Sequence, residues 1–345
     1  MRRPLLLLAL LGVFASTAQA AGSPSMGLRP VGKWKRGYFV YAAGPGTVIH
    51  GAVAVNNGGT AAGAVRVYAV DSTTGQTSGA VYLTSGQKPK DVGAWIRVAT
   101  PSATLKTGQA RTIPFTLTVP ANAAAGQHVG GIVAETVKQR VSGRSKGKAS
   151  VQVRLRSLSI VAVQVNVPGT LVAKLAVGGV TAGGRKGFQQ LLLHVANTGN
   201  VMLKPRGIIS VSDTKGLALG TYALHMDTLL PRTAIDYPVN VKGRGLGAGD
   251  YKASVRISYT GLGGGGSGLV ASAPAFTISS KQQSQVFGGT TNTTAAPSAQ
   301  PTAAPPATSG GGGTAPLVYI GIGAGIVILL GAVYALGARR ARRPA

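Results

Sequence analysis

The chain has 345 residues, no cysteine and a formal net charge of +28, with 35 Lys and Arg against 7 Asp and Glu. The absence of cysteine excludes disulfide frameworks, thiol catalysis and Cys-type metal sites. The few acids are scattered and give no convincing carboxylate pair for hydrolysis, so we expect neither an enzyme nor a protein that holds a metal or a cofactor.

The N-terminal segment 1–20 has the layout of a secretory signal peptide. It begins with Arg2 and Arg3, continues with the apolar residues 5–14 and ends in a small-residue cleavage signal. We therefore expect export, cleavage after Ala20 and a lead-in over residues 21–36. The exported part keeps a net charge of +22 when the Arg residues of segments 1–20 and 339–345 are set aside. This charge predicts attraction to polyanions, which outside a cell are wall polymers, anionic lipids and acidic glycans rather than nucleic acid.

Alternating apolar and polar residues predict strands over residues 47–55, 64–70, 112–119, 130–136 and 151–165. The alternation in the last of these strands slips by one position, because Val153 and Leu155 are apolar and are followed by Leu158 and Ile160. A slip of one residue predicts a β-bulge or a break into two strands.

One pattern occurs twice along the chain. Residues 50–71 and 191–213 each contain an apolar strand, an Asn-rich break and a second strand that ends in Asp. Residues 105–135 and 230–259 each read as a strand, a Gly-containing polar turn and a second strand. Two tandem copies predict an all-β chain with two immunoglobulin-like β-sandwich domains, over residues 37–165 and 166–280. The Asn-rich break is then one recurring corner, because Asn and Gly tolerate the backbone angles of tight reversals.

The C-terminal part changes composition twice. Residues 281–316 are dominated by Thr, Ala, Pro, Gly and Ser, which cannot bury a core and predict a disordered stalk. Residues 317–338 carry no charge and are long enough for a single transmembrane helix. The tail 339–345 carries Arg339, Arg340, Arg342 and Arg343, which places it in the cytoplasm by the positive-inside rule. We expect a single-pass protein of the cell membrane with its N-terminal part outside.

The candidate site residues are few. Of the four histidines, only His225 has an acid close in sequence, Asp227, and one such pair is too little for a metal site or a catalytic triad. A loop predicted between two strands of the first domain is the candidate contact with a polyanion, and its five cations are Lys138, Arg140, Arg144, Lys146 and Lys148. The alternative for this loop is a solvated hairpin connection without a ligand.

A series of short motifs runs through the first predicted domain: Tyr38-Phe39, Pro45-Gly46, Val55-Asn56-Asn57, residues 68–82, Ile113-Pro114-Phe115, Val119-Pro120 and residues 125–135. In this order the motifs resemble the WxL-interacting protein family of bacterial surface proteins. The resemblance implies an N-terminal domain that binds peptidoglycan, a second domain that is an adhesive module, and action beside WxL-type surface proteins. The second domain shares only the generic Asn-turn pattern. Other bacterial sandwich modules with an Asn-Gly corner, including pilus-chaperone-like domains, remain alternatives.

These observations predict a membrane-anchored cell-surface protein that binds peptidoglycan or associated anionic wall polymer and scaffolds surface protein complexes. The alternative is an adhesin or assembly partner that binds another surface or host protein, with no direct wall binding. Cosedimentation of the exported part with purified sacculi discriminates between the two.

Overall fold

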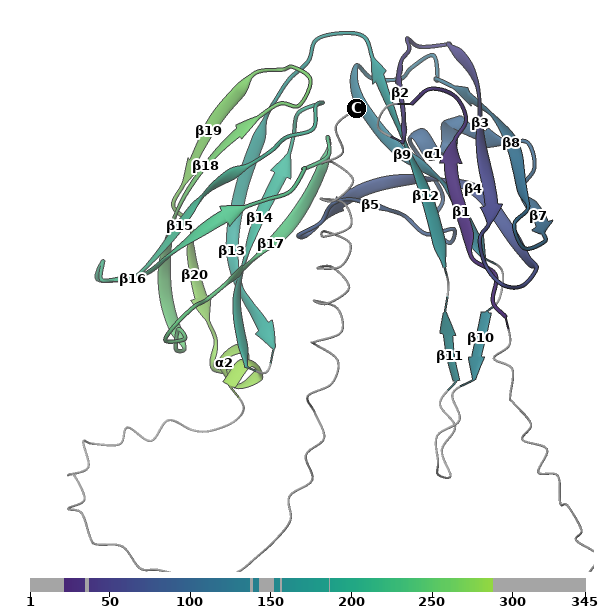
Figure 1. Ribbon diagram of the computed structural model, residues 1–345. Coiled ribbons are helices and arrows are strands. Elements are labelled where there is room, and N and C mark those ends of the chain that lie inside the picture. The colour runs from purple at the N-terminus through teal and green to yellow at the C-terminus, as the bar shows by residue number, and fades with distance from the viewer. Residues whose placement is uncertain are drawn as a thin grey trace, which may run out of the picture. The chain divides into compact units, whose positions relative to one another are not determined.

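The computed structural model describes residues 22–34, 37–136, 139–142, 152–155, 157–185 and 187–287, which all fall in one compact unit. Within these residues the chain folds into two β-sandwiches (Figure 1). The predicted signal peptide, the predicted membrane span 317–338 and the basic tail 339–345 lie outside the described residues. No helix in the described part is long and apolar enough to cross a membrane.

Two sheets face each other in the first sandwich. The strands of one sheet are, in spatial order, β1 (Met26–Pro30), β3 (Val48–Asn57), β8 (Ala110–Thr118) and β6 (Ile96–Val98). Those of the other are β2 (Phe39–Ala42), β12 (Leu158–Val167), β9 (Gly126–Thr136), β4 (Gly63–Gly75) and β5 (Gly79–Tyr82), with β7 (Ser102–Leu105) also pairing with β4. A single helical turn, α1 (Val92–Trp95), precedes β6.

The second sandwich is smaller and also has two sheets. The first sheet has the spatial order β13 (Leu175–Arg185), β14 (Phe188–Asn197) and β17 (Thr233–Asn240). The second has the order β16 (Ala218–His225), β15 (Arg206–Asp213), β18 (Gly249–Thr260) and β19 (Ser267–Ser272), with β20 (Ala275–Ile278) also pairing with β18. The helix α2 (Ser280–Phe287) follows β20.

The alternation read from the sequence matches the burial of the strands. Val65 and Val67 in β4 are fully buried, and so are Val53 and Val55 in β3 across the core. Residues at every second position point to one face of a strand, so these valines fill the space between the two sheets. The fold class predicted from the sequence, all-β with two sandwiches, is confirmed in the described residues.

The predicted phase slip near residue 157 corresponds to a break between two strands. β11 (Gln152–Leu155) pairs with β10 (Gln139–Ser142) in a separate two-stranded ladder, and β12 begins at Leu158. β12 then pairs with β9 along its whole length. Of the two forms that the slip predicted, a bulge or a break, the structure has the break.

The corner predicted to recur is built in the same way in both sandwiches. Asn57 and Asn197 occupy it, and each is only 1% exposed. Each side-chain nitrogen donates a hydrogen bond to the backbone carbonyl four residues further on, at 2.8 Å in both cases. It also donates to a distant carbonyl, that of Leu105 at 3.1 Å or of Leu229 at 3.0 Å. The side-chain oxygen accepts from the N–H two residues further on, at 3.0 Å in both cases, so the recurrence is confirmed.

Two segments differ from their sequence assignments. β1 lies in the range assigned to a lead-in, yet it pairs with β3 over five residues. Residues 281–287, assigned to the disordered stalk, belong to α2. Val286 is 3% exposed in this helix, and its carbonyl accepts a hydrogen bond from the N–H of Gly187. A polar segment with one buried valine thus packs on the second sandwich, which its average composition does not reveal.

Candidate functional site

Intramolecular hydrogen bonds or ion pairs engage all seven acids of the chain, each of which lies in the described residues. Glu135 pairs with Arg66 and Asp227 with Lys204, each at 2.7 Å. The remaining five acids accept hydrogen bonds from histidine, threonine or backbone N–H groups, and they are Asp71, Asp91, Asp213, Asp236 and Asp250. A hydrogen-bonded carboxylate keeps its charge, so the basic surface of both sandwiches follows from numbers alone, with 7 acids against 35 Lys and Arg in the chain.

The histidine–acid pairs differ from the pair found in the sequence. Asp227 binds Lys204 rather than His225, and the hydrogen bonds from Lys204 and from the N–H of Thr228 lower the pKa of this carboxyl. His128 instead binds Asp91 at 2.7 Å, and His194 binds Asp236 at 2.9 Å. These pairs join residues far apart in sequence. No group of three His, Asp or Glu side chains in the described part is placed to hold a metal ion.

The five-cation loop is only marginally represented in the structure. Lys138, Arg144, Lys146 and Lys148 lie outside the described residues. Arg140 lies on β10, where its backbone is directly opposite that of Arg154 on β11. The contact of this loop with a polyanion stays a prediction from the sequence.

The strand β16 forms one edge of the larger sheet of the second sandwich (Figure 1). Its eight residues, ALGTYALH, contain no proline and no Lys, Arg, Asp or Glu. The side chains of Thr221 and Ala223 are exposed, and the residue before the strand, Leu217, is 65% exposed. The strand therefore presents an uncharged backbone edge beside an exposed apolar side chain, a combination that natural proteins usually avoid.

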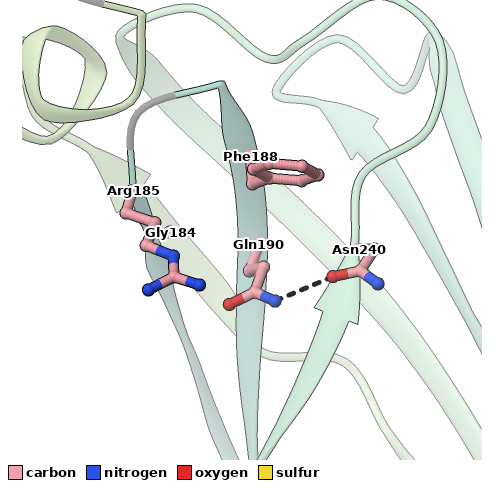
Figure 2. A pocket seen from close by; sticks show the side chains of 5 residues that line it. All are labelled: Gly184, Arg185, Phe188, Gln190 and Asn240. Carbon is pink, nitrogen blue, oxygen red and sulfur yellow. Dashed lines mark hydrogen bonds between the residues drawn. The ribbon is translucent and has the colours of Figure 1, made fainter. Parts of the chain in front are cut away.

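The smaller sheet of the second sandwich carries an open depression of about 410 Å³ at one end. Figure 2 shows the residues that line it, which are Gly184, Arg185, Phe188, Gln190 and Asn240. The amide nitrogen of Gln190 donates a hydrogen bond to the side-chain oxygen of Asn240 at 2.8 Å. Phe188 is 69% exposed, although it is one of only 6 phenylalanines in the chain. The ring of Phe188 therefore lies mostly outside the hydrophobic core of the second sandwich.

A second cavity, of about 570 Å³, lies where the two sandwiches meet. Its lining combines polar and apolar side chains without a charged group: Tyr38, Gln127, Gln164, Asn166, Leu171, Met202, Thr228 and Leu262. Gln127 is 7% exposed, donates to the carbonyl of Leu262 at 2.7 Å and accepts from the N–H of Met202 at 2.6 Å. One side chain of the first sandwich thus binds two backbone groups of the second and fixes one wall of this cavity.

The sequence alone did not single out Phe188 or β16. The signal available for β16 was its composition, a run of eight residues without charge or proline in a very basic chain. Whether such a strand lies at an edge or in the middle of a sheet depends on which strands pair with it. Amino-acid composition does not determine this pairing.

No family model and no curated protein match this chain. Among solved structures, the class 5 fimbriae chaperone CfaA is similar over 72% of this chain and 100% of its own, with 12% identity and a TM-score of 0.35. The Salmonella enterica SafA pilin in complex with the SafB chaperone matches over 74% of this chain and 96% of the matched chain, with 12% identity and a TM-score of 0.32. The CsuC–CsuE chaperone–tip adhesion subunit complex of Acinetobacter baumannii matches over 72% and 97%, with 12% identity and a TM-score of 0.33. At these values the similarities assign neither a function nor a partner to this chain.

Proposed function

We propose that this chain is a membrane-anchored surface protein that binds an extended segment of another surface protein. The observation that carries the proposal is the edge strand β16. An unpaired edge offers a row of N–H and C=O groups to which a partner can add a strand, and such strand addition is a common mode of peptide recognition. The surface location rests on the signal-peptide layout of residues 1–20 and the uncharged run 317–338.

The other long edge strands contain a charge, a proline or both, which oppose strand addition. β16 has neither, although its register with β15 also shifts between Val211 and Ser212. β17 contains Asp236 and Pro238, and β1 contains Arg29 and Pro30. β13 is interrupted by a β-bulge between Val177 and Val180, ends in Arg185 and is rich in glycine. Charges, prolines and bulges are the devices by which proteins prevent pairing at sheet edges. β19 also lacks charge but is shorter, with six residues against eight.

Photo-crosslinking of the full chain on its native cells tests this proposal. A photoreactive residue placed at Thr221 or Ala223 should form an adduct with one discrete surface protein. The matched control is Ser254 of β18, which is also exposed and lies in the middle of the same sheet, beyond Ser210. We expect no such adduct from position 254.

A pair of charged variants completes the test. Thr221→Lys with Ala223→Lys should abolish the adduct, because lysines on an edge strand oppose pairing. Ser254→Lys with Ser258→Lys adds the same charge to the same sheet and should leave the adduct in place. Equal crosslinking from positions 221 and 254, or an adduct that consists only of a second copy of this chain, contradicts the proposal.

Binding to anionic wall polymer is a second candidate function, and the excess of 35 Lys and Arg over 7 acids favours it. Replacing Lys138, Arg140, Arg144, Lys146 and Lys148 together by Gln should weaken cosedimentation with sacculi. It should also flatten the salt dependence of binding, since ion release accompanies polyanion binding. Unchanged binding would remove the loop from this role. Binding that is lost with the charges and independent of β16 would favour this candidate over strand addition.

A further inference from the structure

Three separate segments of the second sandwich contain cations and no acid. They are residues 183–190, 240–247 and 279–287, and their cations within the described residues are Arg185, Lys242, Arg244 and Lys281. All four of these side chains are exposed. The neighbouring acids in sequence are already engaged, because Asp236 binds His194 and Asp250 accepts a hydrogen bond from Thr277. In the described residues none of these four cations is within salt-bridge distance of a carboxylate. Asp250 keeps its charge and lies opposite Thr277, four residues before Lys281.

Specific hydrogen bonds bring the three segments together at one end of the sandwich. The buried side chain of Gln189 donates to the carbonyl of Leu246 at 2.8 Å and accepts from its N–H at 2.7 Å. The carbonyl of Gln189 accepts from the N–H of Val241 at 3.0 Å. Gln189 thus holds the loop of Lys242 and Arg244 against the start of β14.

The helix α2 joins the same place from the other side. The N–H of Gly187 donates to the carbonyl of Val286 at 2.7 Å, and the side chain of Gln282 donates to the carbonyl of Ala182 at 3.2 Å. The ring of Phe287 lies directly against Gly245. Lys281 and Phe287 therefore belong to the same surface as Arg185 and Arg244.

Two aromatic rings stand among these cations. Phe188 is 69% exposed and Phe287 is 48% exposed. Figure 2 shows Phe188 and Arg185 on neighbouring strands at this end of the sheet. We call this surface the basic-aromatic end and define it by Arg185, Phe188, Lys242, Arg244, Lys281 and Phe287.

We propose that the basic-aromatic end binds the surface of an anionic lipid membrane. Cations attract anionic headgroups, and exposed aromatic rings gain by entering the boundary between headgroups and acyl chains. A hydrated wall polymer would engage the cations but would offer the two rings no apolar environment. Along the sequence, α2 is followed by the segment that leads to the uncharged run 317–338. The end that leads to the expected membrane span is thus the end that carries the basic and aromatic side chains.

A single fluorescent label on the full chain tests this inference. The chain has no cysteine, so Ser284→Cys on the exposed face of α2 can be labelled uniquely with an environment-sensitive dye. We expect a blue shift with vesicles that contain phosphatidylglycerol and none with pure phosphatidylcholine, and salt should reverse it because salt screens exposed charges. The control label is Ser267→Cys on β19, which lies opposite Thr260 at the far end of β18 and should report no change. This readout does not involve β16 and is independent of strand addition.

Two matched pairs of variants separate the contribution of the four cations to membrane binding from that of the Phe188 ring. Replacing Arg185, Lys242, Arg244 and Lys281 by Gln should reduce the ratio of membrane-bound to free label about tenfold or more. Replacing the same number of exposed arginines elsewhere, Arg29, Arg97, Arg206 and Arg256, should leave it within about twofold. Phe188→Ser should weaken the shift, whereas Leu269→Ser, which changes an equally exposed apolar residue on β19, should not. Thermal unfolding of each variant shows whether it is folded.

Three outcomes overturn the inference. One is an equal blue shift with vesicles of pure phosphatidylcholine. Another is an equal loss of the shift when four cations of the basic-aromatic end or four arginines elsewhere are replaced. Membrane binding would then depend only on the net charge of the chain. The third is full reproduction of the shift by soluble polyphosphate together with no effect of Phe188→Ser, which would assign the surface to phosphate groups rather than to lipid.

Discussion

The Asn-rich turn of each sandwich contains one buried asparagine, Asn57 or Asn197, whose side-chain amide is fully hydrogen-bonded. Asn57 donates to two carbonyls and accepts from the N–H groups of Ser25 and Gly59. Loss of this side chain would leave carbonyl oxygens without a donor at a site closed to water, and each unsatisfied buried group costs about 1–3 kcal/mol.

Asn57→Ala should therefore lower the free energy of unfolding of the chain by about 2–4 kcal/mol. The neighbouring residue Asn56 is exposed, so Asn56→Ala should change it by no more than about 0.5 kcal/mol. Denaturant titration of both variants measures the difference. Equal effects of the two substitutions would mean that the corner depends on the backbone and not on the buried amide.

Tyr41 provides a pH-dependent contribution to stability. It packs against Trp34 and Phe39, with ring centroids 5.4 and 5.7 Å apart, and burial raises its pKa from 10.0 to about 12. The folded state favours the neutral phenol, so this contribution is complete below pH 10 and is lost as the pH rises to about 12. Between pH 10 and about 12, the free energy of unfolding of Tyr41→Phe should fall less than that of the parent chain. Identical alkaline unfolding curves for the two proteins would exclude Tyr41 as a source of the pH dependence.

At the scale of elements, α2 depends on a single buried side chain. Val286→Ala should lower the free energy of unfolding by about 1–3 kcal/mol, because it removes buried methyl groups next to β13 and β14. The exposed neighbour Gln285 serves as the control, and Gln285→Ala should have little effect. Hydrogen exchange at Gly187, whose N–H binds Val286, should rise in the first variant only. Protection at Gly187 that survives Val286→Ala would show that α2 is held by its backbone contacts.

Elements with a strong local signal were predictable from the sequence. The alternation of β3 and β4 and the Asn corner follow from side-chain periodicity and turn chemistry, and the break before β12 follows from the phase slip. α2 was not predictable, because seven of its eight residues are polar or exposed and its stability comes from contacts with β13 and β14. The edge position of β16 was also hidden, since strand order is set by long-range pairing.

The basic-aromatic end shows the same limit at a larger scale. Arg185, Lys242 and Lys281 are separated by dozens of residues and look like scattered charges in a basic chain. They form one surface only because Gln189 and α2 hold three loops together. A site of this kind requires the fold before it can be recognised.

At the scale of the whole molecule, hydrogen bonds couple the two sandwiches. The hydroxyl oxygen of Thr74 accepts from the N–H of Leu230 at 2.8 Å and lies 2.6 Å from that of Thr233. Together with the two hydrogen bonds of Gln127, these contacts are buried or partly buried and join strands of different cores. We therefore expect the sandwiches to unfold together.

Scanning calorimetry of the full chain should show one transition, and Gln127→Ala with Thr74→Val should split it into two, because each core then unfolds independently. The matched control makes the same substitutions in the exposed turn after β4, as Gln76→Ala with Thr77→Val, and should keep one transition. Two resolved transitions in the parent chain would show that the junction does not couple the cores.

The order of strands in the larger sheet of the second sandwich also determines how the protein carries mechanical tension. A pull exerted by a partner on β16 and resisted at Phe287 passes from β16 through β15 and β18 to β20 and α2. The three steps between strands are ladders of cross-strand hydrogen bonds within one sheet, and β20 continues into α2 along the chain. The first sandwich lies outside the path and stays unloaded. If the chain is anchored and bound as proposed, the second sandwich alone carries the load while the first sandwich remains relaxed.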